Sequence, residues 1–309
     1  MRTRLALVSA GMAVLLAVAL ALAPVDLGRA FGYTVSHPSG AALALLAYTA
    51  AFVLRAASWR PFVGARVPFT KLFSLLMGAL FLNHAAPAKA GDFARMYALA
   101  RRVSAERAVA SVLLSRVVDL AGLLAVLAAA LALSGAGGVG GILLPALAVC
   151  GAAVTIFLLA RLKLPAFSGA MWWHAARLQA ALRGTTRTSL VISFAFAAPA
   201  WVLEAGILAF VGRGLGLDLS PAEVVAATCF AVLVAAIPLA PGSLGTYEAG
   251  MVAALLTFGV PAETAFAAAV TTHAVKFLYA LAAAPFALTE GLAAVRKGEV
   301  RADETRLEV

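Results

Sequence analysis

Long apolar stretches alternate along the chain with short segments that carry most of its lysines and arginines. A helix needs about 20 mainly apolar residues to cross a lipid bilayer. The stretches of about that length are 5–24, 40–58, 108–133, 140–160, 189–211 and 262–289. The pattern predicts an all-α polytopic membrane protein with about six full transmembrane helices.

Two further apolar stretches, 70–103 and 221–258, are interrupted by proline, glycine and charged residues, so neither fits a simple span. Lysine and arginine collect on the cytoplasmic side of membrane proteins. If 70–86 crossed the bilayer, the basic segments 55–71 and 101–107 would lie on opposite sides. A re-entrant helical hairpin keeps them on one side. The same topology predicts a second re-entrant hairpin, which enters from the outside.

This topology places both ends of the chain in the cytoplasm, and we expect the membrane to be the inner membrane of a bacterium. The basic segment 55–71 begins at Arg55, so Arg55 is expected in a cytoplasmic loop. Segment 162–188 contains Trp172 and Trp173 and is expected to form an interfacial helix, because tryptophan favours the membrane–water boundary.

The two interrupted stretches also resemble each other. The segment Pro87-Ala-Lys-Ala-Gly-Asp-Phe-Ala-Arg95 has a degenerate copy in Pro241-Gly-Ser-Leu-Gly-Thr-Tyr-Glu248. Three predicted spans separate the hairpins, so the second copy would be inverted relative to the first. The predicted parts are a single membrane domain 1–290, with inverted halves 1–135 and 140–290, and a charged cytoplasmic tail 291–309.

The composition agrees with a membrane protein. Hydrophobic residues make up 63% of the chain, charged residues 12%, and the mean hydropathy is +0.99, more apolar surface than a soluble domain of this size could bury. The net charge of +10 comes mostly from the connecting segments, so anionic lipid headgroups explain it better than nucleic acid. Cys150 and Cys229 are isolated in apolar stretches and indicate neither a disulfide framework nor a metal site, and nothing indicates a cofactor.

The turns of the two hairpins are predicted to form a polar site inside the membrane. Each turn starts a half-helix, near Gly91 and Gly242, whose free N–H groups attract anions. An intramembrane charge costs at least about 2.5 kcal/mol, so a group of charges indicates function. The predicted substrate-binding residues are Lys89, Asp92, Arg95, Arg116, Asp119, Glu204, Gly242, Ser243, Glu248, His273 and Lys276. The predicted turn-forming residues are Pro87, Gly91, Pro241 and Gly245.

Several candidates also have a purely structural interpretation. Arg116 and Asp119, at i and i+3 on one helix face, would either neutralise each other or bind substrate. His273 is equally compatible with a hydrogen-bonded core histidine and with a ligand group or proton carrier. Asp92 is compatible with a helix N-cap. Glu204 is expected to pair with one of the cations.

Three motifs occur in a fixed order, and the likeness that they indicate covers nearly the whole chain. They are Asn83-X3-Pro87-X-Lys-X-Gly-Asp-X2-Arg95, Ser115-Arg-Val-Val-Asp119 and Pro241-Gly-Ser-Leu-Gly-X-X-Glu248. This set resembles the transmembrane region of the lysylphosphatidylglycerol synthase/flippase family. The resemblance implies a flippase that moves an aminoacylated phospholipid between leaflets. The chain stops about 20 residues after its last span, so we expect no aminoacyl-transferase domain. His273 stands where the family pattern leads us to expect an arginine.

We therefore expect a flippase or scramblase, not an enzyme, that moves a polar phospholipid or an isoprenoid-linked or hopanoid lipid through a central cavity. Without a P-loop, it would draw energy from a gradient or the membrane potential, or need none, with His273 and either Glu248 or Asp119 as a proton route.

Three alternatives belong to other classes. A membrane glycosyltransferase or other lipid-modifying enzyme would use Asp92 and Asp119 as base or metal ligands. A serine hydrolase built on Ser243 and His273 lacks the usual nucleophile spacing. A non-transporting structural partner of a lipid-synthesis complex stays open, as does a homo-oligomer.

Overall fold

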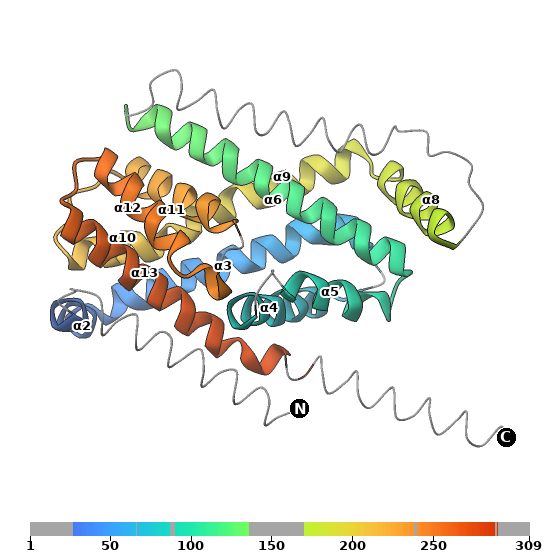
Figure 1. Ribbon diagram of the computed structural model, residues 1–309, viewed down its shortest axis with the longest axis horizontal. Helices are drawn as coiled ribbons and strands as arrows, with labels where there is room; N and C mark the ends of the chain where they lie inside the picture. The colour runs from blue at the N-terminus through green and yellow to red at the C-terminus, as the bar shows by residue number, and fades with distance from the viewer. Residues whose placement is uncertain are drawn as a thin grey trace.

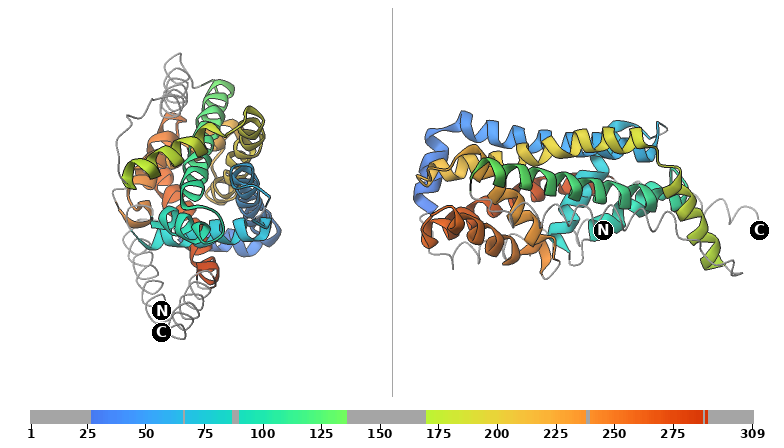
Figure 2. Two further views of the ribbon diagram at one scale, coloured as in Figure 1. Left: turned by 90° about the vertical axis from the view of Figure 1, so that its right-hand side faces the viewer. Right: turned by 90° about the horizontal axis from the view of Figure 1, so that it is seen from above.

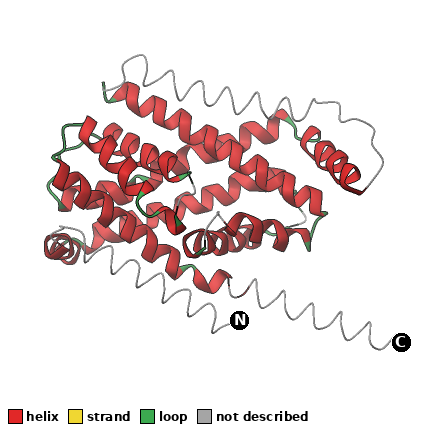
Figure 3. Cartoon of the chain, in the orientation of Figure 1, coloured by secondary structure: helices red, strands yellow, loops and turns green. Residues whose placement is uncertain are grey.

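The computed structural model describes residues 27–65, 67–86, 90–135, 170–237, 240–287 and 289. In these ranges the chain is mostly helical and contains no strand (Figure 3), which confirms the all-α class. The predicted spans 5–24 and 140–160, the turn residue Pro87 and the candidate residue Lys89 lie outside the described residues.

Four segments of the described chain are long and apolar enough to cross a membrane. They are α3 (Pro38–Val63), α6 (Ala105–Leu133), the consecutive helices α9 (Arg187–Glu204) and α10 (Gly206–Gly214), and α13 (Ala262–Ala282). Each coincides with a predicted span, and α3, α6 and α9 run lengthwise through the bundle (Figure 1). The protein is therefore a membrane protein built on long apolar helices.

Shorter helices occupy the two stretches predicted as hairpins. They are α4 (Phe69–Ala85), α5 (Ala90–Ala100), α11 (Pro221–Ala235) and α12 (Thr246–Thr257), with the 3₁₀ turn η1 (Pro241–Ser243) before α12. Helix α4 packs on α5 and α11 packs on α12, so the chain doubles back twice. The longest, α4, has 17 residues and extends for about 25 Å, less than the roughly 30 Å hydrocarbon core of a bilayer. The re-entrant placement and the inverted relation of the halves stay predictions.

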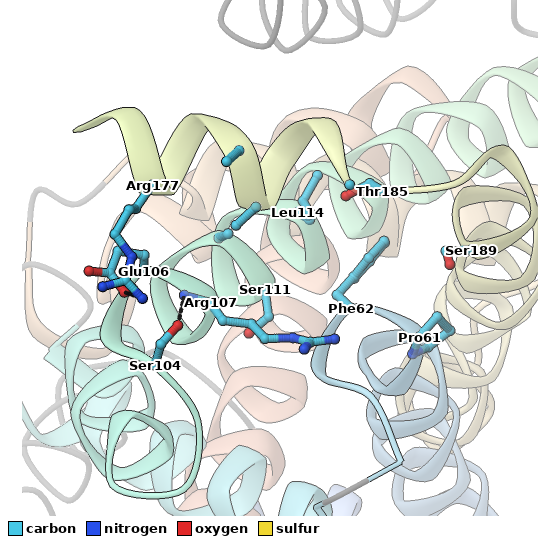
Figure 4. A pocket seen from close by; sticks show the side chains of 14 residues that line it. Pro61, Phe62, Ser104, Glu106, Arg107, Ser111, Leu114, Arg177, Thr185 and Ser189 are labelled. Atoms are coloured by element: carbon cyan, nitrogen blue, oxygen red, sulfur yellow. Dashed lines mark hydrogen bonds and ion pairs between the residues drawn. The ribbon is translucent and has the colours of Figure 1, made fainter. Parts of the chain in front are cut away.

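The first hairpin starts and ends at the same end of the bundle. The last turn of α3, the start of α6, helix α8 (Ala170–Arg183) and the start of α9 line one pocket of about 410 Å³ (Figure 4). Phe62, which precedes α4, and Ser104, which follows α5, both line it. A single crossing by this segment would place them at opposite ends. From Pro61 on, the geometry thus agrees with the prediction that 55–71 and 101–107 share one side, and their cytoplasmic orientation stays a prediction.

The two ends of the bundle carry different accessory helices. Helix α8 lies at the end of the pocket, inside the segment predicted to form an interfacial helix. Helix α2 (Leu27–Ser36), which the sequence analysis did not predict, lies at the other end, beside α10 (Figures 1 and 2).

Local sequence signals set several helix ends. Ser104 caps α6, because its hydroxyl accepts a hydrogen bond from the backbone N–H of Arg107 at 3.3 Å. Ser220 and Glu223 form a capping box at the start of α11. Pro38 occupies the first turn of α3, where a missing N–H costs nothing.

Small residues let the helices approach closely. A Cβ atom on Gly122 of α6 would lie 3.2 Å from the backbone nitrogen of Ala198 in α9. A Cβ atom on Gly250 of α12 would lie 3.0 Å from the Cα atom of Ala231 in α11. Such contacts stabilise helix pairs in membranes through packing, because lipid supplies no hydrophobic drive between helices.

The turn of the second hairpin lies against the end of the first. The 3₁₀ turn η1 contacts α4, and a Cβ atom on Gly242 would lie 3.3 Å from the carbonyl oxygen of His84 and 2.6 Å from the ring of Phe277. Gly242 and Gly245 have φ angles of 63° and 82°, which glycine adopts without strain. The close approach of the two hairpin ends therefore depends on glycine, and it agrees with the prediction that the turns lie together.

Candidate functional site

Charged side chains from five helices meet inside the bundle, and Asp119 marks the site at the midpoint of α6. The members, here called the central charge cluster, are Arg55 (α3), Asp92 and Arg95 (α5), Arg116 and Asp119 (α6), Glu204 (α9) and Lys276 (α13). Charges buried away from water are tolerated only when they are paired. The contacts between members therefore decide how the site is built.

Glu204 holds two cations from two different helices. Its Oε1 atom lies 2.7 Å from Nζ of Lys276, and its Oε2 atom lies 2.5 Å from Nη2 of Arg55. The Glu204 side chain is only 7% exposed. The carboxylate therefore ties α3, α9 and α13 together, and the expected pairing of Glu204 with a cation is seen.

Aromatic rings cover the buried cations. The guanidinium of Arg55 lies 4.2 Å from the ring centroid of Trp201, and Nζ of Lys276 lies 5.0 Å from that of Tyr247. A desolvated cation above an aromatic ring gains about 2 kcal/mol. The indole N–H of Trp201 also donates to the backbone carbonyl of Asp119 at 2.9 Å, which fixes the ring over Arg55.

Asp92 is the main partner of Arg116. The Arg116 Nε and Nη2 atoms donate to the two carboxylate oxygens of Asp92 at 2.8 and 2.7 Å, a two-point geometry that favours arginine over lysine. Nε of Arg95 lies 3.1 Å from the same carboxylate. Asp119 is 3.8 Å from Nη1 of Arg116, so the proposed neutralisation within α6 is only a secondary contact.

Asp119 connects the two groups of ion pairs. One of its oxygens lies 3.4 Å from Nε of Arg55, and the other faces Arg116. The described cluster thus forms one chain of contacts with four cationic side chains and three carboxylates, an excess of one positive charge. Arg116 is 41% exposed, whereas no other member exceeds the 17% of Asp119, so Arg116 forms the accessible end of the cluster.

A line of contacts leads from the pocket at the end of the bundle to the cluster. The hydroxyl of Ser111, which lines the pocket (Figure 4), accepts a hydrogen bond from the indole N–H of Trp59 at 3.2 Å. The Trp59 ring lies 4.9 Å from the guanidinium of Arg95. Arg95 is 3% exposed and also approaches the hydroxyl of Ser115 at 3.4 Å. Ser111 and Trp59 therefore connect the pocket to Arg95 of the cluster.

The second hairpin contributes a separate polar contact. Nδ1 of His273 lies 2.6 Å from a carboxylate oxygen of Glu248, and Nε2 lies 3.0 Å from the carbonyl oxygen of Gly242. The other oxygen of Glu248 accepts a hydrogen bond from the backbone N–H of Gly245 at 2.7 Å. His273 thus contacts both sides of the turn, and its side chain is buried.

Other predicted residues build the turns. Ser243 donates its hydroxyl to the carbonyl of Ala235 at 2.9 Å and has a φ angle of 60°, so its hydroxyl holds the turn. The backbone N–H of Gly91 donates to Oδ1 of Asn83 at 2.9 Å, and a Cβ atom there would collide with the Ala79 carbonyl. Among the described residues, no group of three or more histidine, cysteine or acidic side chains is arranged to hold a metal ion.

The sequence analysis was wrong about Arg55. It assigned Arg55 to a cytoplasmic loop, yet Arg55 lies within α3 and is paired at the centre of the cluster. The helix continues for two more turns because Trp59, Phe62 and Val63 are buried in the core. These apolar residues after Arg55 were the available signal that the span had not ended.

Comparison with known proteins places the chain in a family. The model of the lysylphosphatidylglycerol synthase TM region matches residues 4–284. Searches of curated proteins and of solved structures gave no match. The matched region contains every member of the central charge cluster and both hairpins, and the family indicates a lipid-related membrane protein. The chain therefore belongs to the lysylphosphatidylglycerol synthase TM region family.

Proposed function

We propose that the protein is a flippase or scramblase that moves a polar lipid headgroup between leaflets at the central charge cluster, while the acyl chains stay in the bilayer. The substrate is an anionic or aminoacylated phospholipid, or an isoprenoid-linked lipid that carries phosphate. The observation that carries the proposal is the excess positive charge of the described cluster, buried among apolar helices. Buried charge of this kind lines pathways for polar substrates.

The contacts of the cluster suit exchange with a phosphate. Arg116 is partly exposed, and its 3.8 Å contact with Asp119 is long enough to be replaced by a bound anion. The buried hydroxyl of Tyr247, beside Lys276, has no hydrogen-bond partner among the described residues. An unpaired buried donor costs about 1–3 kcal/mol, so a ligand that accepts from it would be favoured.

The test uses the purified protein in liposomes that contain headgroup-labelled lipids. Anionic phosphatidylglycerol and zwitterionic phosphatidylethanolamine are compared, and a membrane-impermeant quencher reports the fraction in the outer leaflet. We expect Arg116→Gln to slow movement of the anionic lipid at least about tenfold, and more than that of the zwitterionic lipid, because charge-assisted hydrogen bonds to phosphate are lost.

Arg213→Gln is the matched control, because Arg213 is exposed in the last turn of α10, away from the cluster. It should move both lipids as the unmodified protein does. The proposal is wrong if correctly inserted Arg116→Gln protein moves anionic lipid at the rate of the control.

A further inference from the structure

The ring of His273 joins α13 to both sides of the turn before α12. One ring nitrogen faces the Gly242 carbonyl at 3.0 Å and the other faces the Glu248 carboxylate at 2.6 Å. The side chains of His273 and Glu248 are 5% and 14% exposed, so water does not readily replace either contact. A flipped ring would place carbon against both oxygens and lose both hydrogen bonds.

The two contacts together require an additional proton. A carbonyl oxygen only accepts, so Nε2 of His273 must carry hydrogen and donate to Gly242. A neutral imidazole has a single N–H group, so its Nδ1 would then present a lone pair to a carboxylate that also only accepts. The 2.6 Å contact with Glu248 is therefore satisfied only when a proton lies on Nδ1 or on the carboxyl group.

This proton holds the point where the two hairpins meet. His273 fixes the Gly242 carbonyl, and Gly242 packs against the end of α4 and against Phe277. Glu248 fixes the Gly245 N–H at the start of α12. When the proton leaves, the contact with Glu248 becomes a pair of facing lone pairs, and the turn keeps only one of its two hydrogen bonds to α13.

Other titratable and charged groups surround His273. The ring of Tyr247 on α12 lies with its centroid 4.5 Å away, and His84 on α4 lies across Phe277. Lys276 follows one turn later on α13, but Glu204 pairs with it at 2.7 Å. Among these described groups, Glu248 alone lies within hydrogen-bond distance of the His273 side chain, so the pair forms the proton site.

We propose that Glu248 and His273 form a binding site for one proton, and that binding this proton locks the turn of the second hairpin against α13 and α4. Release of the proton removes one of the two hydrogen bonds and loosens the turn, so lipid movement is coupled to proton movement. The coupling to lipid rests on the proposed function, whereas the proton-dependent lock does not.

Two substitutions separate the locked and unlocked states. In Glu248→Gln, the introduced amide N–H₂ donates to Nδ1 of His273 and its carbonyl accepts from Gly245, so the lock forms at every pH. His273→Ala removes the lock at every pH. Glu263→Gln is the matched control, because Glu263 is an exposed acid in the first turn of α13.

Hydrogen–deuterium exchange of the amides in 242–249 measures the lock directly. The exchange rates are first corrected for intrinsic exchange. Protection in the unmodified protein and in Glu263→Gln should then fall about ten- to a hundredfold from about pH 5 to about pH 9, a range that lies on both sides of the ordinary pKa of a histidine. Glu248→Gln should stay protected throughout, and His273→Ala should be unprotected throughout. Equal protection of the unmodified protein at both pH values, or the same fall in Glu248→Gln, overturns the lock.

A second measurement separates the lock from the function. In liposomes with an imposed pH difference, lipid movement by the unmodified protein should change severalfold with the gradient, and movement by Glu248→Gln should not. Movement that ignores the gradient in the unmodified protein overturns the coupling. If no lipid moves although exchange behaves as expected, the proposed function fails and the proton-dependent lock stands.

Discussion

The two helices that follow the turns, α5 and α12, each carry an acid near their start that contacts the next long helix, but the partners differ in chemistry. On α5, Asp92 forms a two-point ion pair with Arg116 of α6. On α12, Glu248 contacts His273 of α13. Arginine stays charged at every physiological pH, whereas histidine gains and loses its charge in that range. The first contact is thus permanent, whereas the second depends on a proton in the lock that we propose.

The charges one turn further along α6 and α13 extend the comparison. Asp119 on α6 faces Arg55 of α3, whereas Lys276 on α13 binds Glu204 of α9. The residues three positions after Arg116 and His273 therefore carry opposite charges. Arg55 and Glu204 then bind each other, which joins the two sides at the centre. The substitutions below test the Arg55–Glu204 ion pair and the difference between the Arg116–Asp92 and His273–Glu248 contacts.

The largest effect is expected at the shared ion pair. Glu204→Gln leaves Arg55 and Lys276 buried without their carboxylate, and breaking a buried pair in this way costs about 3–5 kcal/mol of the free energy of unfolding. Thermal unfolding in detergent checks this, with Glu263→Gln as an exposed acidic control. Equal unfolding temperatures for Glu204→Gln and Glu263→Gln would show that the stability of the fold does not depend on the ion pairs of Glu204.

The two acids near the helix starts should respond unequally to the same change. Asp92→Asn removes the charge that holds Arg116 and Arg95, which should lower the free energy of unfolding by about 1.5–3 kcal/mol. Glu248→Gln keeps both hydrogen bonds and should be nearly neutral. Each variant is the other's control in thermal unfolding at acidic pH, and a larger loss in Glu248→Gln would reverse the comparison.

The glycines of the two turns should also differ. In Gly91→Ala the new methyl group meets the Ala79 carbonyl, and such overpacking costs about 1–3 kcal/mol. In Gly245→Ala no neighbouring atom lies within 4 Å of the new methyl group. Only the strain of the positive φ angle is then expected to lower the free energy of unfolding, by about 1 kcal/mol. Thermal unfolding of the two alanine variants measures the difference, and an equal loss would mean that space at Gly91 is not limiting.

The smallest effect is expected for Arg116→His, which gives Asp92 a titratable partner in place of a permanently charged one. Arg116→His loses one of the two hydrogen bonds to Asp92, which costs about 1 kcal/mol, and 41% exposure of the Arg116 side chain leaves room for the ring. The new imidazole binds Asp92 more strongly when it is protonated, because its positive charge then adds to the hydrogen bond. Its stability relative to the unmodified protein should therefore fall as the pH rises from about 5 to about 8. A pH-independent difference would show that Asp92 does not hold the imidazole.

Much of the architecture follows from local signals in the sequence. The long helices appear as apolar runs, and the turns appear as proline and glycine between charged residues, because span length and backbone freedom are properties of short segments. Motif order also sufficed to indicate the family. The chemistry of the candidates was visible too, since a buried charge is conspicuous in an apolar run.

The pairing of those charges was decided by the tertiary structure. The i, i+3 spacing of Arg116 and Asp119 suggested a local pair, yet Asp92 from another helix binds Arg116 more closely. Arg55 looked like the start of a loop, yet α3 continues and carries it to Glu204. The sequence by itself determined which residues are apolar, which are charged and where the chain turns. Only the packing of the helices decided which charges meet. A carboxylate pairs with a cation only when the two lie about 3 Å apart, and packing brings together side chains that are far apart along the chain.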